Sequence, residues 1–168
     1  MFRARIIASP VILAAGLVCA SCSSSKASPS TGSPDAAQPT GNVGCTQAAG
    51  DAYTPGMQRL GAAGRFSFEL VSSAPAPPAI NDNTFVLQVK DSDGQPVAGD
   101  LSVDLEMPEH GHPSPTQPDI TFDAATSSFT LDPMRLFMVG LWRLTFSFQP
   151  ASGSAADADS AVFNFCIE

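Results

Sequence analysis

Apolar and polar residues alternate in short runs over most of the chain beyond Gly61. Residues 65–70 read R-F-S-F-E-L and residues 142–148 read W-R-L-T-F-S-F, so every second side chain is apolar. A period of two is typical of a β-strand with one buried face and one solvated face. This pattern, together with β-propensity, predicts strands over 65–70, 84–89, 101–107, 119–122, 129–131, 142–148 and 161–167.

The segments between these runs carry turn residues and strand breakers. Pro75, Pro77 and Pro78 cannot donate to a strand ladder and predict a connection. Residues 91–96 read D-S-D-G-Q-P, which predicts a tight turn. Only residues 46–60 have any helical potential. Short strands at regular spacing predict an all-β fold, a single antiparallel immunoglobulin-like β-sandwich of about seven strands.

The first 21 residues have the pattern of a secretory signal peptide. Arg3 and Arg5 precede a mostly apolar stretch over residues 6–19, and small residues follow it. The stretch is shorter than the roughly 20 residues that a membrane-spanning helix needs. We therefore expect export and removal of residues 1–21.

The end of this signal resembles a bacterial lipobox. Ala20 and Ser21 precede Cys22, which is the expected site of lipidation, and an ordinary cleaved signal without lipid is the alternative. Residues 22–44 are rich in Ser, Pro and Gly and predict a disordered tether. One folded domain is expected over 45–168. The expected location is the cell envelope, with a lipid anchor on a bacterial membrane, in the periplasm or at the cell surface.

Charge and missing motifs exclude several function classes. The chain carries a net charge of −8 and has no basic patch, which argues against a nucleic-acid partner. It contains no G-x-S-x-G elbow, phosphate loop or H-E-x-x-H motif, so we do not expect an enzyme.

Two cysteines lie at the ends of the expected domain. Because the chain is expected to be exported, Cys45 and Cys166 predict a disulfide that ties the start of the domain to its last strand. A role as thiolate metal ligands is the alternative. Neither cysteine has a nearby Cys or His partner in sequence, which favours the disulfide.

The candidate chemistry is concentrated in the run M-P-E-H-G-H-P. This run holds both histidines of the chain, His110 and His112, with Met107 just before them. Imidazole and thioether groups together suit copper, and thioether selects the reduced ion. Met138 or Met134 could add a second thioether, because loops at one end of a sandwich cluster in space. The alternatives are histidines that organise the turn and methionines that fill the core.

Three motifs together resemble the YtkA-like domain family. They are D-S-D-G-Q-P-V-A-G over residues 91–99, M-P-E-H-G-H-P over 107–113 and L-F-M-V-G-L-W-R-L-T-F over 136–146. The resemblance covers roughly residues 66–165, and Val139 stands where many relatives have proline. It implies a small exported β-sandwich, often a lipoprotein, with a role in copper handling or in respiratory-oxidase assembly.

The expected function is therefore that of an envelope lipoprotein that binds copper through Met107, His110, His112 and Met138, as a chaperone or a buffer. The alternative is a non-catalytic interaction or structural module that binds no metal. The expected partners are the membrane, through the lipid anchor, and another envelope protein. The oligomeric state is left open.

Overall fold

The computed structural model describes Cys45 and residues 50–168. The expected signal peptide, the lipidation site Cys22 and the expected tether all lie outside the described residues. Within the described part, no helix has the length and apolar character needed to cross a membrane.

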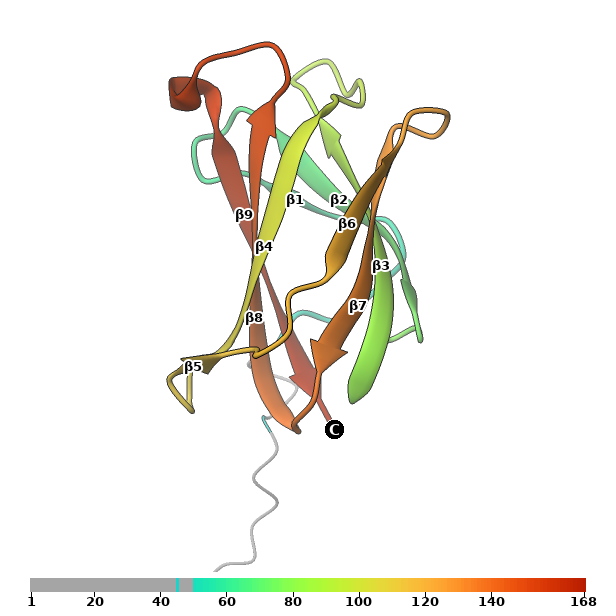
Figure 1. Cartoon of the computed structure of the whole chain (residues 1–168), viewed down its shortest axis with the longest axis vertical. Coiled ribbons are helices and arrows are strands. Elements are labelled where there is room, and N and C mark those ends of the chain that lie inside the picture. Colours follow the sequence, from blue (N-terminus) through green and yellow to red (C-terminus); the bar gives the residue numbers. More distant parts are fainter. Residues whose placement is uncertain (1–44, 46–49) are drawn as a thin grey trace, which may run out of the picture. The chain divides into compact units, whose positions relative to one another are not determined.

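Two antiparallel sheets make up the described domain (Figure 1). The five-stranded sheet has the order β1-β2-β3-β7-β6, and the four-stranded sheet has the order β5-β4-β8-β9. The strands are β1 (Met57–Leu60), β2 (Ser67–Ala74), β3 (Asn81–Lys90), β4 (Gly99–Met107), β5 (His112–Pro113), β6 (Asp119–Asp123), β7 (Ser128–Leu136), β8 (Gly140–Pro150) and β9 (Asp159–Ile167).

This strand order is that of an immunoglobulin domain. Strands β2, β3, β7 and β6 take the places of A, B, E and D in one sheet, and β4, β8 and β9 take those of C, F and G in the other. The predicted all-β immunoglobulin-like sandwich is thus confirmed, with nine strands in the described part in place of about seven.

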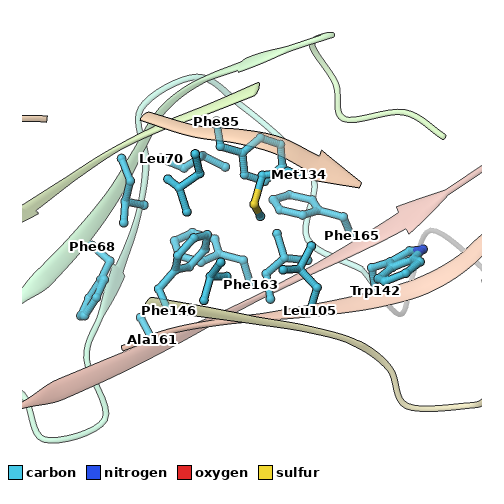
Figure 2. Close-up of a cluster of buried hydrophobic side chains, with 14 of the residues drawn as sticks. Phe68, Leu70, Phe85, Leu105, Met134, Trp142, Phe146, Ala161, Phe163 and Phe165 are labelled. Atoms are coloured by element: carbon cyan, nitrogen blue, oxygen red, sulfur yellow. The ribbon is translucent and has the colours of Figure 1, made fainter. Parts of the chain in front are cut away.

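The alternation seen in the sequence decides which side chains form the core. In β8, Trp142 and Phe146 are fully buried, whereas Arg143 between them is exposed. Full burial of one large apolar side chain stabilises a fold by about 1.5–3 kcal/mol, so this shared core holds the two sheets together. Figure 2 shows members of the core from both sheets: Phe68, Leu70, Phe85 and Met134 from one, and Leu105, Phe146, Phe163 and Phe165 from the other.

Two strands were not among the predicted runs. Strand β1 (Met57–Leu60) lies where the sequence offered only helical potential, and it pairs with β2. Strand β5 (His112–Pro113) lies at the end of the M-P-E-H-G-H-P run, beyond the predicted strand 101–107, and pairs with the end of β4. A single turn of 3-10 helix, η2 (Ala155–Asp157), lies in the loop between β8 and β9.

A buried carboxylate fastens the β1–β2 turn to β9. Asp159 is 5% exposed, and its oxygens accept the backbone N–H groups of Ala63 at 2.7 Å, Arg65 at 2.8 Å and Phe66 at 3.1 Å. A Cβ atom on Gly61 would lie 2.2 Å from this carboxylate, so the close approach requires glycine. Burial raises the pKa of Asp159, but the backbone N–H donors outweigh it and hold the pKa below its usual value.

One end of the sandwich, here called the hairpin pole, gathers three segments that are distant in sequence. They are the turn 108–111 between β4 and β5, the turn 137–139 between β7 and β8, and the end of β9. The strand register brings them together, because Glu106 lies opposite Arg143 and Gly140 lies opposite Ile167. In Figure 1 this pole is the lower end, where β5 and the C-terminus lie.

The predicted disulfide is present at the same pole. Cys45 is bonded to Cys166, with their Cα atoms 5.6 Å apart, and Cys166 lies opposite Leu141 in the β8–β9 ladder. Close by, the Asp51 N–H donates to the Asn164 carbonyl at 2.6 Å, and the Asn164 N–H donates to the Asp51 carboxylate at 2.9 Å. The start of the domain is therefore fixed to β9 at the hairpin pole.

Candidate metal site

A short β-hairpin presents the two histidines. Strands β4 and β5 are joined by the four residues 108–111, and the backbone N–H groups of His110 and Gly111 both donate to the Met107 carbonyl at 3.0 Å. Gly111 has φ of 68°, a conformation that glycine adopts without strain. Beyond β5, the Ser114 N–H donates to the Leu105 carbonyl of β4 at 2.7 Å and holds the end of the hairpin. The turn is therefore fixed by its own backbone.

The imidazoles of His110 and His112 lie side by side and are exposed. Their ring centroids are 5.8 Å apart, and the ring planes are tilted by 56°. Metal–nitrogen bonds of about 2 Å place the centroids of two imidazoles on one ion roughly 5–6 Å apart. The separation of the two rings is thus within the range found for two imidazoles on one ion.

A backbone carbonyl fixes the tautomer of the His112 ring. Its Nδ1 lies 3.2 Å from the Pro113 carbonyl, which can only accept, so Nδ1–H is the donor. In a neutral ring, Nε2 then keeps its lone pair for a metal ion. Histidine ligands commonly donate their other ring N–H to a carbonyl or carboxylate in this way, which fixes the tautomer.

Met107 lies directly opposite His112 in the β4–β5 ladder. Opposed residues of an antiparallel pair project to the same face of the sheet, so the thioether and the imidazole share a face. Met107 is fully buried, and its Cε would lie 2.7 Å from a Cβ atom on Gly140. Gly140, which has φ of 132°, therefore leaves space for the methyl group of Met107.

The β7–β8 turn packs against the hairpin through Phe137. Its ring stacks on His112, with centroids 6.2 Å apart and an interplanar angle of 23°. Phe137 also contacts Trp142. The centroids of these two rings are 5.3 Å apart, in an edge-to-face arrangement. Trp142 Nε1 donates to the Met138 carbonyl at 2.9 Å and so fixes the turn that carries Met138.

The methionines differ in where their side chains lie. Met138 is half-buried and packs against the core at the hairpin pole. Met134 is fully buried in β7, and Figure 2 shows it between the sheets beside Phe85 and Phe165. The structure therefore brings His110, His112 and Met107 together in one hairpin and sets the Met138 turn beside it, whereas Met134 is a core residue.

Charged groups near the hairpin are mostly solvated. Glu109 is exposed at the turn, and Glu106 pairs with Arg143 at 2.9 Å on the outer face. Among the described residues, no three His, Cys, Asp or Glu side chains form a group that could hold a metal ion. A metal ion at this pole would need donors beside the two imidazoles, and the thioethers of Met107 and Met138 are the candidates.

A cavity of about 600 Å³ lies between the start of the domain, the β2–β3 loop and the end of β9. Two of its polar side chains have partners within the protein. The Tyr53 hydroxyl accepts the Ser73 N–H at 2.7 Å, and Asp51 pairs with Arg59. These contacts hold the first described segment against the sandwich.

Sequence reasoning missed Phe137 as part of the site. It was recognised only as an apolar residue in the family motif, and its contact with His112 depends on the pairing of distant strands. The signal that could have found it is the neighbouring M-x-G-x-W pattern, which places an aromatic cluster at the start of β8.

Comparison with known proteins identifies one family. The family model described as YtkA-like matches residues 62–147, a span that includes the whole hairpin and the Met138 turn. No curated protein and no solved structure matches the chain. Proteins with this domain are generally exported. Because the match covers half of the chain, the protein belongs to the YtkA-like family.

Proposed function

We propose that this protein is a lipid-anchored copper-binding protein of the cell envelope, acting as a chaperone or buffer. The observation that carries the proposal is the histidine pair: two exposed imidazoles with ring centroids 5.8 Å apart, one of them fixed by a carbonyl. Met107 and Met138 add the thioether groups that favour the reduced ion. The protein is not an enzyme in this proposal.

The mechanism is ligand exchange. A Cu(I) ion binds the free imidazole nitrogens of His110 and His112 and a thioether, and a partner protein then replaces these ligands one at a time. No electron is transferred, and the ion keeps its oxidation state throughout. The exposure of both histidines supports this mechanism, because an incoming ligand can approach the ion from solvent.

The lipid anchor is the second part of the proposal. Cys22, with Ala20 and Ser21 before it, is the acceptor, and residues 22–44 connect it to the domain. Replacing Cys22→Ala is expected to remove incorporated fatty acid and to release the exported protein from the membrane fraction. Fatty-acid labelling that is unchanged in this variant would contradict the anchor without affecting the metal proposal.

An anaerobic competition titration of the full chain with Cu(I) tests the metal site. We expect one tightly bound ion per chain and loss of at least 100-fold in affinity in the His110→Ala/His112→Ala double variant, since two ligands are removed together. Glu109→Gln is the matched control, because this exposed residue lies in the same turn and is not a proposed ligand. Equal and weak binding by all three proteins would leave a partner-binding module without metal.

A further inference from the structure

The hairpin supplies only part of the ligand set that a divalent transition-metal ion prefers. Zn(II) is bound in structural sites by four ligands in a tetrahedron, with a preference for thiolate, imidazole and carboxylate. The thioethers of Met107 and Met138 are soft ligands, suited to Cu(I) rather than to Zn(II). An ion of this kind on His110 and His112 therefore keeps coordination positions that point to solvent.

We propose that Zn(II) joins two copies of this chain, hairpin to hairpin, through a shared site of four imidazoles. The proposal rests on the proposed role of His110 and His112 as ligands and names a second copy as the partner that completes the site. Each chain contributes the same pair, so a two-fold axis passes through the ion, which is the commonest symmetry of protein dimers.

The position of the histidines in the fold permits this approach. His110 lies in the tight turn 108–111, and His112 lies in β5, the edge strand of its sheet. Both residues are exposed, so a second hairpin can reach them from solvent. Val139, 42% exposed in the neighbouring turn, gives each copy an apolar side chain at the same pole.

Charge makes the association dependent on the ion. Each chain carries a net charge of −8, and exposed Glu109 lies next to His110, so two bare hairpins repel one another. A divalent cation between them offsets this repulsion locally and supplies the only strong bonds across the contact. Cu(I), which is satisfied by fewer and softer ligands, is held within one chain by the histidines and a thioether.

Native mass spectrometry of the full chain in detergent tests the proposal, because it reports the number of chains and of metal ions in each species. With half an equivalent of Zn(II), we expect a two-chain species that carries one ion and that disappears on addition of a chelator. With Cu(I), we expect a single chain carrying one ion. His112→Ala should stay monomeric with Zn(II), and Glu109→Gln should dimerise at least as well as the unchanged chain.

The outcomes separate this inference from the proposed function. A single chain that holds one Zn(II) ion at every ratio would overturn the shared site, while Cu(I) binding could still stand. A two-chain species that persists in His112→Ala would show that the contact does not pass through the histidines, and would also overturn it. If neither metal binds, the histidine pair is not a metal site, and both proposals fail together.

Discussion

The rings of His112 and Phe137 lie nearly parallel, with an interplanar angle of 23° and centroids 6.2 Å apart. This contact joins the β4–β5 hairpin to the β7–β8 turn. Through Phe137 it also connects His112 to the buried Trp142. The exposed ring of His112 is thus packed against the buried part of the fold, which would reduce the conformational freedom that the proposed metal binding must remove.

Replacing Phe137→Leu should weaken metal binding without removing a ligand. Aromatic contacts of this kind contribute about 0.5–1.5 kcal/mol, so we expect the Cu(I) affinity to fall by about 2- to 10-fold. The measurement is the same competition titration. Phe122→Leu is the control, because Phe122 pairs with Phe129 in another part of the sandwich. A larger loss in the control than in Phe137→Leu would contradict the positioning role.

Gly140→Ala should lower the free energy of unfolding and displace the thioether of Met107. The new Cβ would lie 2.7 Å from Met107 Cε, and φ of 132° is strained for any other residue. We expect a loss of about 1–3 kcal/mol in the free energy of unfolding, measured by urea denaturation. Gly94→Ala, at φ of 77° with open space around it, is the comparison for positive φ without a close contact, and it should lose less. A loss at Gly140 no larger than the loss at Gly94 would contradict the prediction.

Asp159→Asn should lower the free energy of unfolding at neutral pH and make it depend less on pH in acid. The lowered pKa of Asp159 means that the folded protein favours the carboxylate. Its contribution is therefore present above the unfolded value of 3.8 and is lost as the pH falls through the lower folded value. We expect a loss of about 2–4 kcal/mol at neutral pH, because hydrogen bonds to a buried charge are broken. The variant should also show a flatter pH dependence of stability below about pH 4.

The control for this experiment is Asp82→Asn. Asp82 also has a lowered pKa, caused by its hydrogen bond with Arg135, but this pair lies on the surface. Its replacement should leave the unfolding midpoint nearly unchanged, since exposed ion pairs contribute little. An equally small effect at Asp159 would contradict its role in fastening the β1–β2 turn.

Reduction of the Cys45–Cys166 bond should destabilise the domain. The bond closes a loop with a sequence separation of 121, for which the chain-entropy model gives about 4–5 kcal/mol. Urea unfolding with and without reductant measures this difference. The Cys45→Ser/Cys166→Ser variant should match the reduced protein and should not respond to reductant. A difference below about 1 kcal/mol would mean that the unfolded chain is compact without the bond.

All seven predicted strands are present in the structure. Most of them, such as the run in β8, alternate strongly enough to specify a buried face, whereas β6 has only exposed and half-buried residues and is predicted by its β-propensity. The two missed strands lack this signal. In β1 (Met57–Leu60) only Met57 is partly buried, so its conformation is imposed by pairing with β2. In β5 (His112–Pro113) the proline argues against a strand, and only the hairpin turn brings these two residues beside β4.

The site was predictable only in part for a related reason. Two histidines separated by one residue lie close together in a turn, so the sequence alone could identify them as candidate metal ligands. Whether Met138 and Phe137 lie beside that turn depends on the β4–β8 register, which a single sequence does not encode locally. The burial of Met107 likewise follows from its place at the end of an inward-facing alternation in β4.

The disulfide also determines how the domain bears mechanical load. Tension on the chain before Cys45 passes through the sulfur atoms to Cys166, next to the end of β9. When the pull is directed along that strand, the nine residue pairs of the β8–β9 ladder are loaded together in shear instead of opening one by one. The hairpin with the two histidines is formed by β4 and β5. In the sheet order it lies on the opposite side of β8 from β9. Such a load would therefore reach the histidine pair indirectly, through β8 and the contacts that Phe137 makes with Trp142 and His112.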